Sequence, residues 1–202
     1  MTIIGLCGGS GSGKGTVARL LEEYAVPNIN ADDIYRRLTA SGGALIPALS
    51  KEFGSSVISS DGALDRKRLS SIVFSSEGHE EKLRRLNKIT HTAVLEEAEK
   101  RIADFEKDGI DFIVFDAPLL FESGFNSKCD IIVAVVADVE KRIERIVKRD
   151  SITVKMAKER ISNQLSDEFL KMNSDYVIVN NGELCELEMS VKELAEKILI
   201  RG

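Results

Sequence analysis

The sequence has only three cysteines, three prolines and two histidines. With so little proline, 43% hydrophobic and 30% charged residues, the composition is that of a soluble globular protein and excludes a disordered or low-complexity chain. Cys7, Cys129 and Cys185 are odd in number and far apart, with no CxxC pair and no histidine nearby. This pattern predicts buried thiols in a reducing compartment and argues against disulfides or a zinc site.

The sequence also lacks a basic excess and a long apolar run. Its 28 Lys and Arg residues and 33 Asp and Glu residues give a formal net charge of −5, whereas a general nucleic-acid binder carries a basic excess. The longest apolar run, residues 131–137, is much shorter than the ~20 residues that span a bilayer. No basic segment precedes the first apolar stretch, so no signal peptide is expected. We expect a cytoplasmic protein that binds neither nucleic acid nor membrane and needs no obligate protein partner.

Short apolar runs rich in β-branched residues alternate with helical patterns along much of the chain. Five such runs read as buried strands, at residues 2–7, 27–30, 110–115, 130–137 and 176–180. Strands that are buried on both faces and alternate with helices indicate a parallel sheet between two helical layers. The predicted fold is therefore an α/β three-layer sandwich with a five-stranded parallel sheet.

Two segments interrupt this alternation. Residues 31–90 hold helical patterns and turn signals without a clear apolar strand, which predicts a helical insertion. Residues 150–172 are polar and charged with a weak apolar pattern, which is typical of a short helical lid. The remaining segments, 1–30, 91–149 and 173–202, then form the core.

The strongest motif is the glycine-rich stretch at residues 8–16, Gly-Gly-Ser-Gly-Ser-Gly-Lys-Gly-Thr. It follows the first strand, opens a helix and matches GxxxxGK from Gly8 to Lys14. Glycines allow the backbone to wrap around a phosphate, the helix N-terminus points at the anion, and lysine neutralises the β and γ oxygens. The motif predicts a P-loop NTPase fold in which the phosphates of a nucleotide are bound by Gly11, Ser12, Gly13, Lys14, Gly15 and Thr16.

One position departs from the usual loop. Gly15 follows the lysine, where Ser or Thr usually contacts magnesium, and the hydroxyl comes one residue later at Thr16. Either Thr16 or water is then the magnesium contact from this loop. No Asp in the chain has Gly three residues later, so a GTPase switch motif is missing. A small phosphotransferase fits best.

Asp32 follows the second predicted strand, near the sheet edge where ligands of open α/β folds collect. A carboxylate there can deprotonate an acceptor hydroxyl, but Asp32 or Asp33 can equally cap the following helix, and the residues alone slightly favour the cap. Arg36 lies one helical turn after Asp32, so it is a candidate ligand for an anionic acceptor.

Asp116 ends the apolar strand near residues 113–115, a pattern that places a carboxylate near the magnesium of a P-loop nucleotide. Arg142, Arg145 and Arg149 share one helix face. This stripe is either a solvated surface or a clamp for the transferring phosphoryl group, which Arg160 of the lid joins on closure.

With these residues collected, the chain resembles the dephospho-coenzyme A kinase family, a member of the nucleoside-monophosphate-kinase-like P-loop group. The segment Asp-Ala-Pro-Leu-Leu-Phe-Glu at residues 116–122 is the most distinctive part. The other matching positions are residues 8–16, 30–34, 53–54, 62–66, 72–74, 91, 145–149, 160–164 and 175–182.

The resemblance implies transfer of the γ-phosphoryl of ATP, with Mg²⁺, to the ribose 3′-hydroxyl of dephospho-coenzyme A. It implies that Asp32 activates the acceptor, that Lys14 and Arg145 are catalytic, and that Arg145, Arg149 and Asn180 bind ATP, Asn180 near the adenine. It also assigns the acceptor to the 31–90 insertion and makes His91 a substrate ligand. The chain departs from the family at Thr92, usually proline, and at Asn30, often aspartate.

Two other readings remain open at the level of the sequence. The Lys-Gly-Thr form of the loop also occurs in kinases of nucleoside monophosphates, so another small acceptor is the first alternative. The second is a regulatory module that binds ATP without transferring phosphate, with the arginine stripe as a partner surface.

Overall fold

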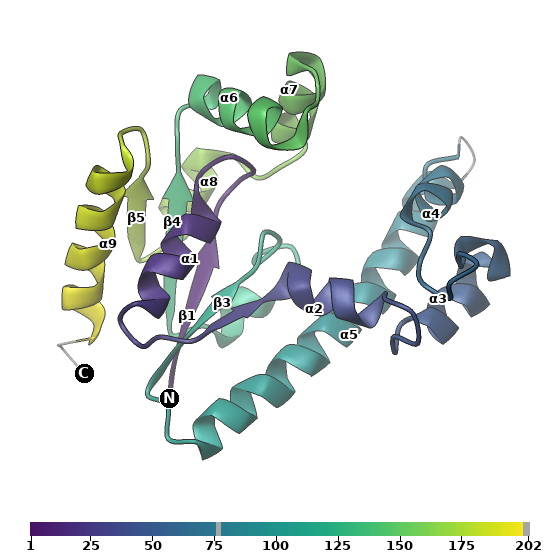
Figure 1. Ribbon diagram of the computed structural model, residues 1–202, viewed down its shortest axis with the longest axis horizontal. Helices are drawn as coiled ribbons and strands as arrows, with labels where there is room; N and C mark the ends of the chain where they lie inside the picture. Colours follow the sequence, from purple (N-terminus) through teal and green to yellow (C-terminus); the bar gives the residue numbers. More distant parts are fainter. Residues whose placement is uncertain (76–77, 200–202) are drawn as a thin grey trace. The chain divides into compact units, whose positions relative to one another are not determined.

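The computed structural model describes residues 1–75 and 78–199 (Figure 1). Within these residues, strands and helices alternate around one sheet, and a run of helices separates β2 from β3. The strands are β1 (Thr2–Cys7), β2 (Asn28–Asn30), β3 (Phe112–Asp116), β4 (Ile131–Val136) and β5 (Tyr176–Val179). The α-helices are α1 (Lys14–Glu22), α2 (Ala31–Leu38), α3 (Ile46–Phe53), α4 (Arg66–Val73), α5 (His79–Lys107), α6 (Val139–Asp150), α7 (Val154–Ser162), α8 (Asp167–Met172) and α9 (Leu184–Leu199).

The strands form one parallel sheet in the order β2-β3-β1-β4-β5. In its register, Leu6 lies beside Asp116 on β3, and Cys7 lies beside Ala134 on β4. The carboxyl ends of the central strands therefore meet at one edge, which is where the glycine-rich loop leaves β1. The predicted five-stranded parallel α/β fold is confirmed.

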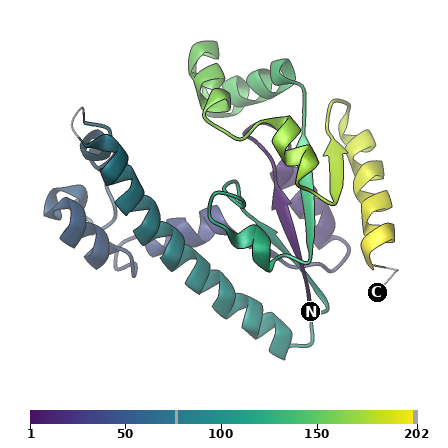
Figure 2. The same ribbon diagram turned by 180° about the vertical axis from the view of Figure 1, so that it is seen from behind.

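Alternation along β1 explains the layers on the two faces of the sheet. Ile4 and Leu6 belong to the apolar core that includes buried residues of α1 and α9, the two helices on one face (Figure 1). Gly5 faces the opposite layer, where an added Cβ would lie 2.6 Å from Cys129 Sγ. On that side Phe115 of β3 packs against Phe125, and α8 covers part of the sheet (Figure 2). Helices thus lie on both faces, as the sequence predicts.

The chain divides into two compact units, and the second contains residues 30–104. It consists of α2–α4, most of α5, the short 3₁₀ helix at Ser55–Val57 and an isolated antiparallel bridge between Ile58 and Leu64. Its own apolar core comprises Leu45, Leu49, Val57, Leu64, Leu69 and Val73. The unit is mainly helical, and it extends past residue 90 because α5 continues through that position without a break.

No helix in the described part of the chain is long and apolar enough to cross a membrane.

The three cysteines lie in different environments. Cys7 is buried, Cys129 is partly exposed and Cys185 is exposed, and all three are free thiols. The prediction of buried thiols is therefore wrong for Cys185, which lies in the solvent-facing first turn of α9. Burial raises the pKa of Cys7 to about 11 and that of Cys129 to about 12, so both stay protonated near neutral pH.

We predict that one thiol of the native protein reacts rapidly with a disulfide reagent. At pH 8, a disulfide reagent such as DTNB should modify Cys185 at least ~10-fold faster than Cys7 and Cys129, because only a thiolate that solvent can reach attacks the reagent. All three should react in guanidinium chloride. A Cys185→Ser variant is the control and should lose the fast phase; a persisting fast phase would mean that one of the other two thiols is accessible.

Candidate functional site

The glycine-rich loop runs from the end of β1 to the start of α1. Gly11 and Gly13 have positive φ angles of 79° and 96°, a conformation that side chains disfavour. An added Cβ at Gly13 would overlap Asn180 Nδ2, and one at Gly11 would lie 2.6 Å from the carbonyl oxygen of Arg142. The loop therefore needs glycine both for its turn and for its close approach to α6 and to the residue after β5.

Lys14 and Asp116 form an ion pair at the carboxyl edge of the sheet. Lys14 is the first residue of α1, and Asp116 ends β3 directly beside β1. Their side chains are only 12% and 2% exposed, so water screens this pair little. Asp116, which the sequence predicts near the magnesium of a bound nucleotide, therefore lies against the lysine of the glycine-rich loop.

Arg145 and Asn180 donate hydrogen bonds to backbone carbonyls of the loop. The Asn180 amide donates a hydrogen bond of 2.8 Å to the carbonyl of Ser12. The Arg145 guanidinium donates to the carbonyl of Gly11 at 3.2 Å and to that of Asn180 at 3.1 Å. The tertiary structure thus brings these two predicted ATP ligands, about 35 residues apart in sequence, onto the same loop.

Arg142 is the buried member of the arginine stripe, whereas Arg149 is exposed. Its side chain is 3% exposed and donates to the carbonyl of Ser10 at 3.0 Å, to Gln164 at 3.0 Å and to Asp167 at 2.9 Å. Arg142 was visible in the stripe, but nothing in the sequence separated its role from that of Arg145. Gln164 lies in the segment 160–164 that matches the family, but the sequence indicated no role for it, because the partners of its side chain are 22 or more residues away.

Arg149 and Arg160 meet at Asp150, where α6 ends. Arg149 contacts both carboxylate oxygens of Asp150, at 2.7 and 3.0 Å, and Arg160 pairs with the same carboxylate. The hydrogen bonds from these arginines, Arg149 first, lower the pKa of Asp150 well below its usual range. Arg149 also reaches Ser10 Oγ at 3.4 Å, so both cationic groups lie beside the loop.

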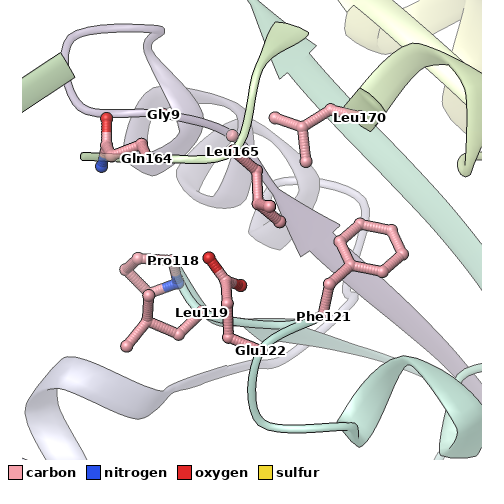
Figure 3. A pocket seen from close by; sticks show the side chains of 9 residues that line it. Gly9, Pro118, Leu119, Phe121, Glu122, Gln164, Leu165 and Leu170 are labelled. Atoms are coloured by element: carbon pink, nitrogen blue, oxygen red, sulfur yellow. The ribbon is translucent and has the colours of Figure 1, made fainter. Parts of the chain in front are cut away.

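A small pocket opens between the loop and the turn after β3 (Figure 3). It is lined by Gly8, Gly9, Pro118, Leu119, Phe121, Glu122, Gln164, Leu165 and Leu170. Figure 3 shows Glu122 and Leu165 pointing into this space from opposite walls. The distinctive segment after Asp116 therefore borders the loop.

Three predicted acceptor ligands belong to the second unit. Asp32 is exposed in the first turn of α2, and Arg36 in the last turn of α2 pairs with Asp33 at 3.0 Å. His91 is partly exposed on α5. Asn30, not an aspartate, caps α2 by accepting a hydrogen bond of 3.0 Å from the Asp33 amide. The preference for Asp32 or Asp33 as the cap is therefore wrong: the carboxylates lie in the first turn, where the helix dipole favours negative charge.

Comparison with known proteins identifies relatives along the whole chain. A family model described as dephospho-CoA kinase matches residues 2–186. The dephospho-CoA kinase of Corynebacterium glutamicum is 37% identical over 201 residues, which is 100% of this chain and 99% of the relative. The crystal structure of TT1252 from Thermus thermophilus has a TM-score of 0.78 at 28% identity and covers 98% of this chain and 97% of that one. Dephospho-CoA kinase from Campylobacter jejuni shares the fold, with a TM-score of 0.70, 20% identity and coverage of 97% and 96%.

The two neighbouring glycines of the loop should respond differently to alanine. Gly13→Ala should lower the free energy of unfolding by ~1–3 kcal/mol, because the new methyl group combines a positive φ with a clash against Asn180. Gly15→Ala is the matched control: nothing lies within 4 Å of its Cβ, and alanine in a helix should stabilise by ~0.5–1 kcal/mol. Urea unfolding measures both; equal effects would contradict the close packing at Gly13.

Proposed function

Because the chain belongs to the dephospho-CoA kinase family, which phosphorylates the ribose 3′-hydroxyl of dephospho-CoA with ATP in the last step of CoA biosynthesis, we propose that the residues around the glycine-rich loop carry this transfer. The observation that supports the proposal most is the convergence of Lys14, Asp116 and Arg145 on one loop.

In the proposal, the loop at Gly11, Ser12, Gly13, Lys14, Gly15 and Thr16 binds the ATP phosphates, and Lys14 neutralises the β and γ oxygens. Arg145 stabilises the charge that develops during transfer, and Arg149 adds a second cation. Asn180, which is 7% exposed and bonded to the loop, borders the adenine. The buried Ser12 Oγ has no hydrogen-bond partner among the residues that the structure describes, which suits a polar ligand at the loop.

Mg²⁺ fits the Asp116 carboxylate, which lies beside Lys14. Asp116 and Thr16 would hold the ion, directly or through water, and the phosphates would complete its shell, because Mg²⁺ is usually bound by one or two carboxylates together with substrate phosphates. The ion supplies charge neutralisation at the β and γ oxygens. Both side chains are hard oxygen donors, so the donor set suits this metal.

On the acceptor side, Asp32 takes the proton of the ribose 3′-hydroxyl. The 3′ oxygen forms a bond to the γ-phosphorus, while the bond between the γ-phosphorus and the β-phosphate oxygen breaks. Arg36, His91 and Arg160 bind the acceptor. The helical insertion carries the acceptor and residues 150–172 form a lid that excludes water, which would otherwise accept the phosphoryl group. The exposed Asp32 carboxylate and the Arg160–Asp150 pair beside the loop support these roles.

We further propose that the enzyme works in the cytoplasm on its small-molecule substrates, without nucleic acid, membrane or an obligate protein partner. The net charge of −5 supports this, because the cations gather locally around the loop while the whole chain is acidic.

The reaction is tested by measuring ADP release from Mg-ATP with and without dephospho-CoA, together with the mass of the product. We expect acceptor-dependent ADP and a product that gains one phosphoryl group. Lys14→Ala is the control and should lose most of the activity, since no other loop side chain replaces its charge. ATP binding without acceptor-dependent ADP would contradict the proposal, and turnover with nucleoside monophosphates alone would favour another acceptor.

Asp32 and Asp33 provide a matched pair for the catalytic base. Asp32→Asn should lower kcat by ~10²–10⁴-fold and leave the Kd for ATP nearly unchanged, because the amide cannot accept the hydroxyl proton. Asp33→Asn removes the same charge from the same helical turn but only the surface pair with Arg36, so kcat should stay within ~3-fold of the parent's. Steady-state kinetics separates the two. Near-parental turnover of Asp32→Asn would exclude it as the base.

A further inference from the structure

We infer that Gln164 is a positioning residue for the phosphate loop: through Ser10 and Arg142, it holds the loop in the shape that binds the ATP phosphates. Gln164 lies in the turn between α7 and α8, 154 residues after Ser10. The inference rests on the proposed function, in which this loop binds ATP. It concerns a side chain that touches the loop rather than the substrate.

The side-chain oxygen of Gln164 accepts two hydrogen bonds. One comes from the backbone N–H of Ser10 at 2.9 Å and the other from Arg142 Nη2 at 3.0 Å. Arg142 Nε in turn donates to the carbonyl oxygen of Ser10 at 3.0 Å. Both backbone polar groups of Ser10 are therefore held by this pair of side chains, and the three residues form a closed ring of hydrogen bonds.

Arg142 is itself fixed in place. It is 3% exposed, and its Nη1 donates to Asp167 at 2.9 Å. A buried guanidinium keeps its acceptors, because an unsatisfied buried donor is costly. Two of these acceptors are Gln164, in the turn before α8, and Asp167, at the start of α8. The position of this turn therefore determines the direction of the Arg142 side chain and, with it, the position of Ser10.

The loop packs against this pair over three consecutive residues. A Cβ at Gly9 would overlap Arg142 Nη2 and lie 3.1 Å from Gln164 Oε1, and a Cβ at Gly11 would lie 2.6 Å from the Arg142 carbonyl oxygen. Ser10, between them, makes the hydrogen bonds described above. Neither glycine has room for a side chain, so the loop backbone lies directly against Arg142 and Gln164.

Loss of the Gln164 acceptor should therefore affect ATP binding more than the chemical step. Without this acceptor, the nucleotide must order the Ser10 turn when it binds, and that ordering is subtracted from the binding free energy. Once ATP is bound, Lys14 and Arg145 act as before. An interaction of this kind changes Kd and KM more than kcat.

The test compares three variants of the full chain. Gln164→Leu removes the acceptor at similar size, Gln164→Glu keeps an acceptor oxygen, and Asn163→Leu makes the same change at the exposed neighbouring position. Isothermal titration with ATP gives Kd, and assays with dephospho-CoA give kcat and KM. We expect Gln164→Leu to raise Kd and KM for ATP at least ~10-fold, about 1.4 kcal/mol, with kcat within ~3-fold. For Gln164→Glu and Asn163→Leu, Kd, KM and kcat should each stay within ~3-fold of the parent's values.

An unchanged Kd in Gln164→Leu, or an equal loss in Gln164→Glu, would overturn the inference. A purely structural role would lower the melting temperature of Gln164→Leu without raising the Kd measured well below it. If Gln164→Leu does not fold, Gly9→Ala replaces it: crowding of Arg142 should raise the Kd for ATP, and an unchanged Kd refutes the coupling. If the parent protein does not bind ATP, the proposed function is contradicted, and the inference with it. If the parent and Gln164→Leu bind ATP equally well, the inference alone is refuted.

Discussion

The site depends on the close approach of the glycine-rich loop to α6 and to the residue after β5. Three elements meet there because parallel strands bring their carboxyl ends to one edge. The loop backbone is in contact with Arg142 on one side and Asn180 on the other, so its path is determined by neighbours distant in sequence as well as by its own glycines. This contact places Lys14 at the start of α1 with its side chain against Asp116.

Charge around the loop is balanced locally, although the chain is acidic overall. Lys14 is paired with Asp116, and Arg149 and Arg160 are paired with Asp150. In each case the carboxylate lies at the end of a strand or helix. Burial raises the pKa of Asp167, and the positive charge of Arg142 beside it opposes this shift.

The second unit has a separate physical basis. Its helices bury their own apolar cluster around Leu49 and Val57, and Asn30 begins α2 by capping it. Because the side-chain oxygen of Asn30 caps the helix, the carboxylate of Asp32 is not needed as a cap. The Asp32 carboxylate, exposed in the first helical turn, is therefore accessible to a substrate.

The sequence alone determined the sheet, the loop and the family. Apolar runs mark buried strands, and a glycine pattern that only a phosphate-binding turn requires identifies the loop, because both signals are local in the chain. The roles of Arg142, Asn30 and Gln164 were decided only by the tertiary structure. Arg142 and Arg145 have the same charge on the same helix face, and only packing buries Arg142 under Ser10. The spacing did not distinguish which residue caps α2, and the partners of Gln164 come from remote segments. A side chain's role follows from what surrounds it, and the surroundings of these residues exist only in the folded chain.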